Sequence, residues 1–239
     1  MSLNDAVVDY FFQEANYYDK LNKRENFRFQ KDKMFPCLND KGVNSGDTGL
    51  YFWQDLWGAM HVFQRKPEIH YDIGSRVDGF IAHLVSFNQK VCTLDIRPLR
   101  TEIPNVSFME CDATKMENIE ENSIESLSAL CSLEHFGLGR YGDPIDPEAC
   151  FTCFKAIEKR MKKGGMFYMS VPVGQEHVEF NAHRVFNAST IVNSFPNMKL
   201  VEYSVTGNDT LERNIPIDKY DNFPERGCVF VGLFAFEKM

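Results

Sequence analysis

The chain has 239 residues, of which 44% are hydrophobic and 25% are charged, a composition typical of one sizeable globular domain with appendages. Its net charge of −8 argues against a dedicated nucleic-acid binder, because neutralising phosphates requires clustered lysines and arginines. No stretch approaches the ~20 apolar residues that cross a bilayer, and the polar N-terminal sequence lacks signal-peptide order, so we expect a cytoplasmic protein without a membrane span.

Residues 1–66 predict an N-terminal cap or arm, helical and rich in aromatic side chains that mix with charged ones. Within it, the apolar side chains of 51–65 recur at helical spacing: Trp53, Leu56, Trp57, Met60 and Phe63. We expect this helix to lay one face on the main sheet, with core packing the leading explanation of the aromatics and a substrate lid the alternative. From 67 to 239, strands and helices alternate, which predicts an α/β domain with a largely parallel sheet.

The first predicted strand ends at Asp72 and leads through Gly74 into an amphipathic helix that starts near Val77. A glycine in this turn lets a ligand approach the backbone, and the helix N-terminus offers unpaired N–H groups to an anion. Arg76 and Asp78 stand two and four residues after Gly74, where we expect glycines in a dinucleotide-binding turn, and this disfavours a nicotinamide site.

Two further acidic residues follow the next two predicted strands. Asp95 ends the second strand, about 20 residues beyond the first acidic strand end, where a carboxylate accepts both ribose hydroxyls of a nucleotide cofactor. Asp112 ends the third, where it can accept from an adenine amino group while the Ala113 N–H donates to the ring. A solvated turn aspartate is the plain alternative for each residue alone.

A fourth apolar run ends near Leu130 and is followed by Glu134 and His135. In a doubly wound sheet, ligands lie across the carboxyl ends of the strands, so chemistry is expected just after each apolar run. Four such strand ends in chain order predict a nucleotide-type cofactor site.

Two later segments are candidates for holding an acceptor, since catalytic groups concentrate on loops at this edge of the sheet. The first is the glycine-rich loop 137–144, which carries Arg140 and Tyr141. The second, 176–186, follows the fifth strand and carries Arg184 and two histidines. We expect these two arginines and Tyr141 to bind an acidic or hydroxyl-rich acceptor.

Histidine suits the general base that a hydroxyl acceptor benefits from, because its pKa lies near the working pH. His135 and His183 are the leading candidates, with Glu134 and His177 in supporting positions. For each histidine, a structural hydrogen-bonding role is the alternative.

The seven cysteines, an odd number scattered along the chain, suit a reducing compartment and predict mostly buried thiols. Cys150 and Cys153 have the C-x-x-C spacing of a metal site, but they share one helical face with Phe154 and Ile157, and no second cysteine pair completes a zinc site. We therefore expect core packing there and no bound metal.

The chain ends in two β-rich runs, 199–205 and 228–239. Together they predict an antiparallel terminal strand pair, which distinguishes this sheet from an all-parallel dinucleotide fold.

From Tyr71 to about Val173, these segments resemble the class I S-adenosylmethionine-dependent methyltransferases. Asp72-Ile73-Gly74 is similar to a shortened first motif, Leu94-Asp95 to the second, Cys111-Asp112-Ala113 to the third, and MKKGGMFYMSVPVG to the fifth-strand region. The resemblance implies a Rossmann-like sheet flanked by helices, with S-adenosylmethionine as cofactor. It also implies the following cofactor contacts: Asp72, Gly74, Ser75, Asp95, Ile96, Asp112, Ala113 and Leu130.

Within that superfamily, DIGSRVDGF, DIRPL, EHFGLGRYGDPIDPE and FNAHRVF resemble a little-studied family of unknown function that is often associated with bacterial surface-polysaccharide synthesis. The resemblance implies methyl transfer, most simply to an oxygen of a sugar or another small polar acceptor. A catalytically silent binding or scaffold protein, with Arg76 blocking the cofactor cleft, is the alternative. A dehydrogenase is disfavoured by the missing glycines.

Overall fold

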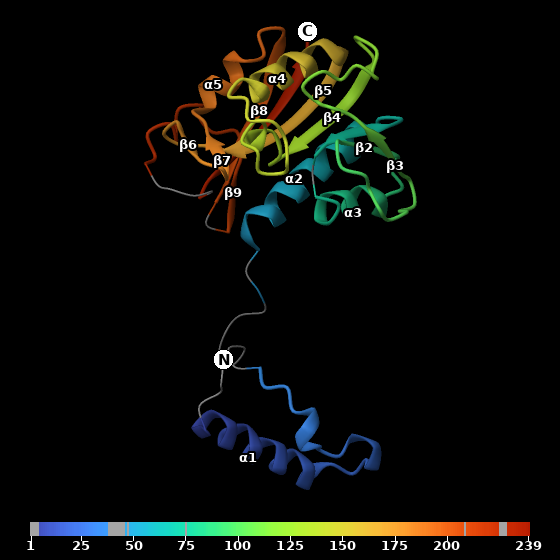
Figure 1. Cartoon of the computed structure of the whole chain (residues 1–239), viewed down its shortest axis with the longest axis vertical. Coiled ribbons are helices and arrows are strands. Elements are labelled where there is room, and N and C mark those ends of the chain that lie inside the picture. Colours follow the sequence, from blue (N-terminus) through green and yellow to red (C-terminus); the bar gives the residue numbers. More distant parts are fainter. Residues whose placement is uncertain (1–4, 38–45, 47, 75, 208, 225–228) are drawn as a thin grey trace. The chain divides into compact units, whose positions relative to one another are not determined.

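The computed structural model describes residues 5–37, 46, 48–74, 76–207, 209–224 and 229–239. By its internal contacts the chain divides into two compact units, 1–47 and 48–239 (Figure 1). Among the described residues, no helix combines the length and the hydropathy that a bilayer crossing requires.

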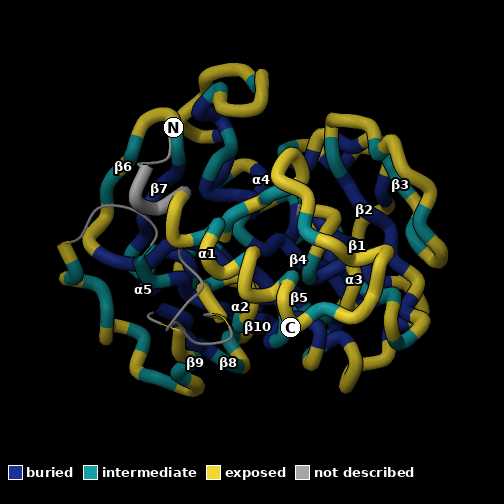
Figure 2. The backbone as a smooth tube through the Cα atoms, turned by 90° about the horizontal axis from the view of Figure 1, so that it is seen from below, coloured by how far each residue is buried: buried dark blue, intermediate teal, exposed yellow. Residues whose placement is uncertain are grey.

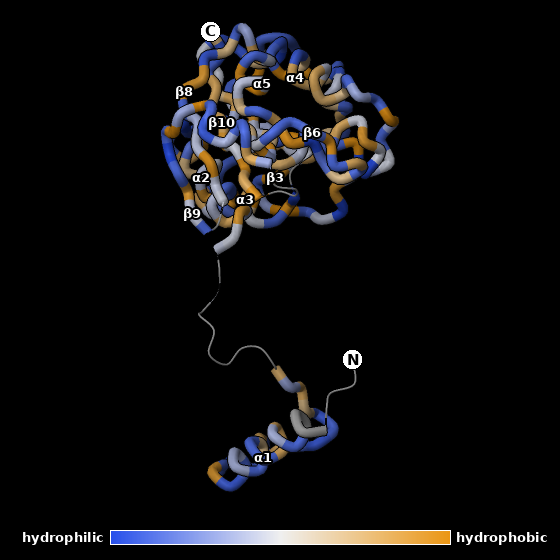
Figure 3. The backbone as a smooth tube through the Cα atoms, turned by 90° about the vertical axis from the view of Figure 1, so that its left-hand side faces the viewer, coloured by the Kyte–Doolittle hydropathy of each residue, from blue (hydrophilic) through white to orange (hydrophobic). Residues whose placement is uncertain are grey.

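The first unit consists of helix α1 (Asp5–Leu21) and two 3-10 turns, Glu25–Phe27 and Lys31–Lys33. Hydrophilic and hydrophobic residues mix along the helix (Figure 3). The segment after it folds back onto the helix, because the Tyr18 hydroxyl donates to the Phe27 carbonyl (3.1 Å) and the Phe29 N–H donates to Asp19 Oδ1 (3.1 Å).

The second unit contains an eight-stranded sheet in the order β3-β2-β1-β4-β5-β10-β8-β9. The strand bounds are β1 His70–Ile73, β2 Val91–Asp95, β3 Val106–Glu110, β4 Ile124–Leu130, β5 Met161–Pro172, β8 Met198–Gly207, β9 Thr210–Glu212 and β10 Val231–Lys238. The five neighbouring strands β3, β2, β1, β4 and β5 pair in parallel, whereas β10 is antiparallel to both of its neighbours. This arrangement confirms the predicted, largely parallel sheet with its antiparallel terminal strand.

Helices cover both faces of this sheet, as α2 (Gly49–Arg65), α3 (Gly79–Ser86), α4 (Ala149–Arg160) and α5 (Ala188–Asn193). Because side chains alternate along a strand, β10 sends Phe234 and Phe236 to the α4 and α5 side and Leu233 and Ala235 to the α2 and α3 side. The strands in the middle of the sheet are consequently buried on both faces (Figure 2).

The prediction that Cys150 and Cys153 fill the core is confirmed, since both lie in α4 and are fully buried among apolar neighbours. Of the other described cysteines, Cys92 and Cys111 are also buried. Cys228 lies outside the described residues.

The predicted helix over 51–65 is present as part of α2, but the face it buries differs from the expected one. Trp57 is 1% exposed, whereas Met60 and Phe63 are 40% and 53% exposed. The buried stripe runs through Gln54 and Gly58 instead, because the Ser170 hydroxyl on β5 donates to Gln54 Oε1 (2.7 Å) and Phe80 packs against the glycine. Thus α2 belongs to the unit 48–239, whereas its residues were predicted to be part of an N-terminal cap or arm over 1–66.

Candidate functional site

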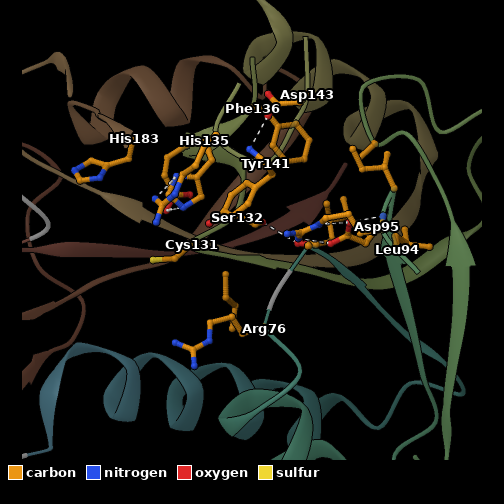
Figure 4. Close-up of a pocket in the computed structure, with 18 of the residues that line it drawn as sticks. Arg76, Leu94, Asp95, Cys131, Ser132, His135, Phe136, Tyr141, Asp143 and His183 are labelled. Atoms are coloured by element: carbon orange, nitrogen blue, oxygen red, sulfur yellow. Dashed lines mark hydrogen bonds and ion pairs between the residues drawn. The ribbon is translucent and has the colours of Figure 1, made fainter. Parts of the chain in front are cut away.

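A cavity of about 1100 Å³ opens at the carboxyl ends of the parallel strands in the second unit. Figure 4 shows His183, His135, Tyr141 and Asp95 following one another along it. All strand ends from β1 to β4 contribute to its lining, as expected for a doubly wound sheet.

Gly74 makes the turn between β1 and α3 with φ of +64°, a conformation that strongly favours glycine. Its N–H donates to the Leu94 carbonyl (3.0 Å), and an added Cβ would lie 3.3 Å from the Ser132 Cβ. The turn therefore places bare backbone at the cavity wall. Ser75, the next predicted contact, lies outside the described residues.

Arg76 lies at the edge of the cavity, with a side chain that is 79% exposed. It forms an ion pair with Asp78 (2.8 Å), whose carboxylate also accepts the Gly79 N–H (2.7 Å) and so caps α3. The capping carboxylate thus holds the arginine beside the helix start.

Asp72 does not line the cavity, which corrects the expectation that it touches a cofactor. It is fully buried on the same strand face as His70, two residues earlier. The Ser128 hydroxyl donates to its carboxylate, and His70 Nε2 lies 2.9 Å from that hydroxyl. Burial lowers the pKa of His70 to about 3, so its imidazole is neutral. Because the Ser128 hydroxyl donates to Asp72, His70 Nε2 donates a hydrogen bond to that hydroxyl. Asp72 therefore anchors a buried polar chain beneath the site.

Asp95 lines the cavity as predicted, but Arg97 already engages its carboxylate. The Arg97 backbone N–H, Nε and Nη2 donate to it at 2.8, 3.0 and 2.8 Å. Ile96 also lines the cavity and is 49% exposed. Arg97 was not predicted as a site residue, although its position two residues after the strand-end aspartate is the spacing of a local side-chain turn.

The end of β3 adds Asp112 and Ala113 to the cavity lining, and the end of β4 adds Leu130. Burial alone would raise the pKa of Asp112, but hydrogen bonds from Thr114 and the charge of Lys115 outweigh it and lower that pKa. Asp112 Oδ1 accepts from the Thr114 N–H (3.0 Å) and hydroxyl (2.6 Å). The carboxylate is thus held ionised at the strand end.

Glu134 and His135 lie in a short 3-10 turn, Leu133–His135, directly after β4 and line the cavity. Glu134 is 2% exposed, and burial raises its pKa to about 8. Burial lowers the pKa of His135 to about 4, so its pKa does not lie near the working pH as expected from the sequence, and the ring is a weaker base than an exposed histidine. Both groups are therefore mainly neutral at pH 7.

The tautomer of His135 follows from its contacts. Its Nδ1 lies 2.6 Å from the Ala182 carbonyl, which can only accept, so Nδ1 carries the proton. Its Nε2 is left with a lone pair and lies 3.5 Å from Glu134 Oε1. The ring thus offers one oriented proton acceptor at the cavity.

The loop 137–144 folds around Asp143. Its carboxylate accepts N–H groups from Gly137 (2.8 Å), Gly139 (3.3 Å) and Tyr141 (3.2 Å). Burial alone would raise the pKa of Asp143, but these backbone hydrogen bonds outweigh it and lower that pKa. The loop thereby brings Arg140 and Tyr141 into the lining, as predicted for both.

His183 also lines the cavity, on the short strand β7 (His183–Val185), and its ring centroid lies 6.5 Å from that of His135. Burial lowers its pKa, and its Nε2 lies 3.4 Å from Glu179 Oε2. His177, on the paired strand β6 (His177–Glu179), is outside the cavity lining and contacts the other oxygen of Glu179 (3.3 Å). His177 therefore lies outside the cavity and is linked to His183 through Glu179.

Arg184 does not line the cavity and is 6% exposed, which corrects its expected role as a substrate binder. Its guanidinium donates to the carbonyls of Phe136 (2.6 Å), Pro147 (3.2 Å) and Glu134 (3.3 Å). Strand alternation explains the difference, because neighbours on β7 point to opposite sides. Arg184 thus ties the residues that flank the loop 137–144 to β7.

Asp55 is a second lining residue that the sequence analysis missed. It lies on α2 and is 9% exposed, and a Cβ at Gly79 would lie 2.2 Å from its Oδ2. Burial raises the pKa of Asp55. No local pattern pointed to it, because only the docking of α2 brings it to the strand ends.

In the part of the chain that the structure describes, no group of three or more histidine, cysteine or acidic side chains is arranged to hold a metal ion. No curated protein matches the sequence. The sequence pattern of "Caenorhabditis protein of unknown function, DUF268" matches residues 82–214, more than half of the chain. The chain belongs to this family. The matched DUF268 segment holds Asp95, Asp112, His135 and the loop 137–144, and it leaves out β1 and the Gly74 turn.

Solved structures share the fold at low identity. One is the 1,6-didemethyltoxoflavin-N1-methyltransferase of Burkholderia thailandensis, crystallised with S-adenosylhomocysteine (TM-score 0.53, 15% identity, covering 80% of this chain and 84% of that one). Another is the N-methyltransferase NodS of Bradyrhizobium japonicum, with the same ligand (0.50, 11%, 79% and 87%). A third is the [4+2]-cyclase SpnF (0.54, 12%, 77% and 81%). These neighbours establish the methyltransferase-like fold of this DUF268 protein.

Proposed function

We propose that this DUF268 protein transfers the methyl group of S-adenosylmethionine to a small polar acceptor. The observation that carries the proposal is a single cavity lined both by the strand-end groups Gly74, Asp95 and Asp112 and by His135 with its oriented Nε2 lone pair. The first set suits a nucleoside, and the second suits a proton that leaves an attacking hydroxyl or amine.

The residues present fit the cofactor. Gly74 offers backbone without a Cβ, Asp95 would accept the ribose hydroxyls, and Ala113 would lie beside Asp112 against the adenine. Leu130, at the end of β4, adds an apolar side chain to the same cavity. The acidic lining suits a ligand that carries a sulfonium and an ammonium group. When bound, S-adenosylmethionine would supply an electrophilic methyl carbon.

The reaction itself demands mainly positioning, because displacement at a methyl carbon needs the two reacting atoms in line. The acceptor atom would bond to the methyl carbon, the sulfur would keep the electron pair of the broken bond, and the acceptor proton would pass to His135 Nε2. The Ala182 carbonyl fixes that nitrogen as the acceptor. The neutral carboxyl of Glu134 beside it avoids a buried charge before the proton arrives.

We further propose that the acceptor is a sugar or a related hydroxylated molecule in the cytoplasm, handled in surface-polysaccharide synthesis. Exposed aromatic rings at the cavity support this choice, since Tyr51, Phe52 and Tyr141 are 55%, 46% and 45% exposed and all line it. Such rings pack against the apolar face of a sugar while nearby polar groups bind its hydroxyls.

A catalytically silent binding or scaffold protein is the second candidate. The observation in its favour is the three-point contact of Arg97 with Asp95, which fills the carboxylate that the ribose would need. In this alternative the cleft keeps its shape and binds no cofactor.

Calorimetric titration with S-adenosylmethionine and S-adenosylhomocysteine, with NAD as a control, separates the two candidates. We expect saturable binding of the first two and none of NAD. Asp95→Ala should weaken S-adenosylhomocysteine binding at least about ten-fold, because hydrogen bonds to a charged group contribute roughly 1.5–3 kcal/mol. Asp218→Ala, which removes an exposed carboxylate outside the cavity lining, is the matched control. No binding at millimolar ligand would reject the methyltransferase proposal.

A further inference from the structure

Among the residues that the structure describes, the cavity lining contains one cation without an acidic partner. Of the four lysines and arginines in its lining, three form ion pairs: Arg76 with Asp78 (2.8 Å), Arg97 with Asp95 (2.8 Å) and Lys115 with Asp112 (3.3 Å). The fourth is Arg140, and within the described ranges no carboxylate lies within ion-pair distance of it. Its charge is therefore available to a ligand.

Arg140 is held in place at the reacting end of the cavity. Its Nη1 donates to the Ala182 carbonyl (3.0 Å), the same oxygen that orients His135. Its positive charge acts on three titratable groups nearby. It contributes to the lowered pKa values of His135 and His183, and it partly offsets the rise that burial causes in the pKa of Glu134. An anion bound by Arg140 would therefore sit beside the proposed base.

The Tyr141 ring contacts a second guanidinium, that of Arg97, beside Arg140. The Arg97 and Arg140 Cζ atoms lie 4.7 and 5.2 Å from the centroid of its ring, and the His135 ring packs edge-on against it. Arg97 is paired with Asp95, the carboxylate that the cofactor ribose would engage. Once the ribose competes for that carboxylate, Arg97 can turn to a ligand while it stays on Tyr141.

Building on the proposed function, we propose that the acceptor carries a carboxylate or phosphate group, bound by Arg140 and, after the cofactor ribose has engaged Asp95, also by Arg97. The cofactor and the acidic acceptor then bind cooperatively, with the cofactor favoured first. Guanidinium groups suit either anion because they donate two parallel hydrogen bonds.

The test measures the dissociation constant of S-adenosylhomocysteine alone and with saturating glycerol, glycerate or glycerol 3-phosphate, at an ionic strength held constant with chloride. These three probes share hydroxyl groups and differ in the anion. We expect one or both anionic probes to tighten S-adenosylhomocysteine binding about five-fold or more, and glycerol to have no effect. The probe that acts identifies the anion as carboxylate or phosphate.

Variants locate the effect. Arg140→Gln should abolish the coupling, whereas Lys163→Gln, which removes one exposed charge outside the cavity lining, should keep it. Arg97→Gln should bind S-adenosylhomocysteine more tightly than the wild type, because Asp95 loses its competitor, and should show weaker coupling. An equal effect of glycerol, no effect of either anion, or coupling that survives Arg140→Gln would overturn the proposal.

The two proposals can fail separately. If S-adenosylhomocysteine does not bind, methyl transfer is rejected, and direct titration with glycerate and glycerol 3-phosphate decides the anion site. Binding that Arg140→Gln abolishes would support that site, and no such binding would overturn it too.

Discussion

The buried carboxyl of Glu134 makes a strong prediction about stability and pH. Its pKa rises from the ordinary 4.5 to about 8 because burial penalises the charged form. The unfolded chain therefore releases this proton near pH 4.5, and the folded protein keeps it up to about pH 8. Stability from the neutral carboxyl is fully present below pH 4.5 and is lost as the pH rises to about 8.

The size of the loss follows from the same shift. At about 1.4 kcal/mol for each pH unit, the difference between the pKa of 4.5 in the unfolded chain and about 8 in the folded protein corresponds to roughly 5 kcal/mol in the free energy of unfolding. Glu134→Gln keeps the shape of the side chain and removes its titration. We expect the variant to match the wild type near pH 4.5 and to exceed it by several kcal/mol at pH 9.

Urea denaturation of the wild type and the variant at half-unit steps from pH 4.5 to 9 measures this difference. Glu148→Gln, at an exposed glutamate, is the control and should follow the wild-type curve. Parallel stability curves for Glu134→Gln and the wild type over the whole range would show that Glu134 ionises normally in the folded protein, and the role given to its neutral form would be wrong.

Two further variants test the geometry around the cavity. Gly74→Ala should cost about 1–2 kcal/mol of stability and weaken S-adenosylhomocysteine binding. The backbone φ of +64° strains an alanine, and the new Cβ would lie 3.3 Å from the Ser132 Cβ. An unchanged urea midpoint and an unchanged affinity would contradict this prediction. Arg184→Met should destabilise the protein by at least roughly 2 kcal/mol, because it removes the donor of one buried and two partly buried carbonyl hydrogen bonds, and thermal unfolding measures the loss. If Arg184→Met kept full stability but lost ligand binding, Arg184 would instead be a binding residue, as expected from the sequence.

Much of the fold and part of the site could be predicted from local patterns. Strand-end residues such as Asp95, Asp112 and Glu134 were located because an apolar run followed by an acid is visible in a short window, and all three line the cavity. The alternation of strands and helices likewise predicted the largely parallel sheet, and the two β-rich runs at the end of the chain predicted its antiparallel strand.

The remaining errors concern the direction in which a side chain points. Asp72 and Arg184 lie on strands next to the cavity, but each side chain points away from it. Because successive side chains on a strand point to opposite faces, a prediction that is wrong by one residue places a side chain on the wrong face. Asp55 could not be predicted because it depends on how α2 docks, which involves pairs as distant as Trp57 and Glu202. Tertiary packing, which is not a property of a short window, decides these positions.

The order of strands in the sheet limits how this protein can be divided. The segment shared with the family, 82–214, excludes β1, which pairs with β2 and β4, and β10, which pairs with β5 and β8. An expression fragment cut to that segment would lack two interior strands, and the rest of the sheet would be left in pieces with unpaired edges. A shortened version for biochemical work therefore has to run from residue 48 to residue 239.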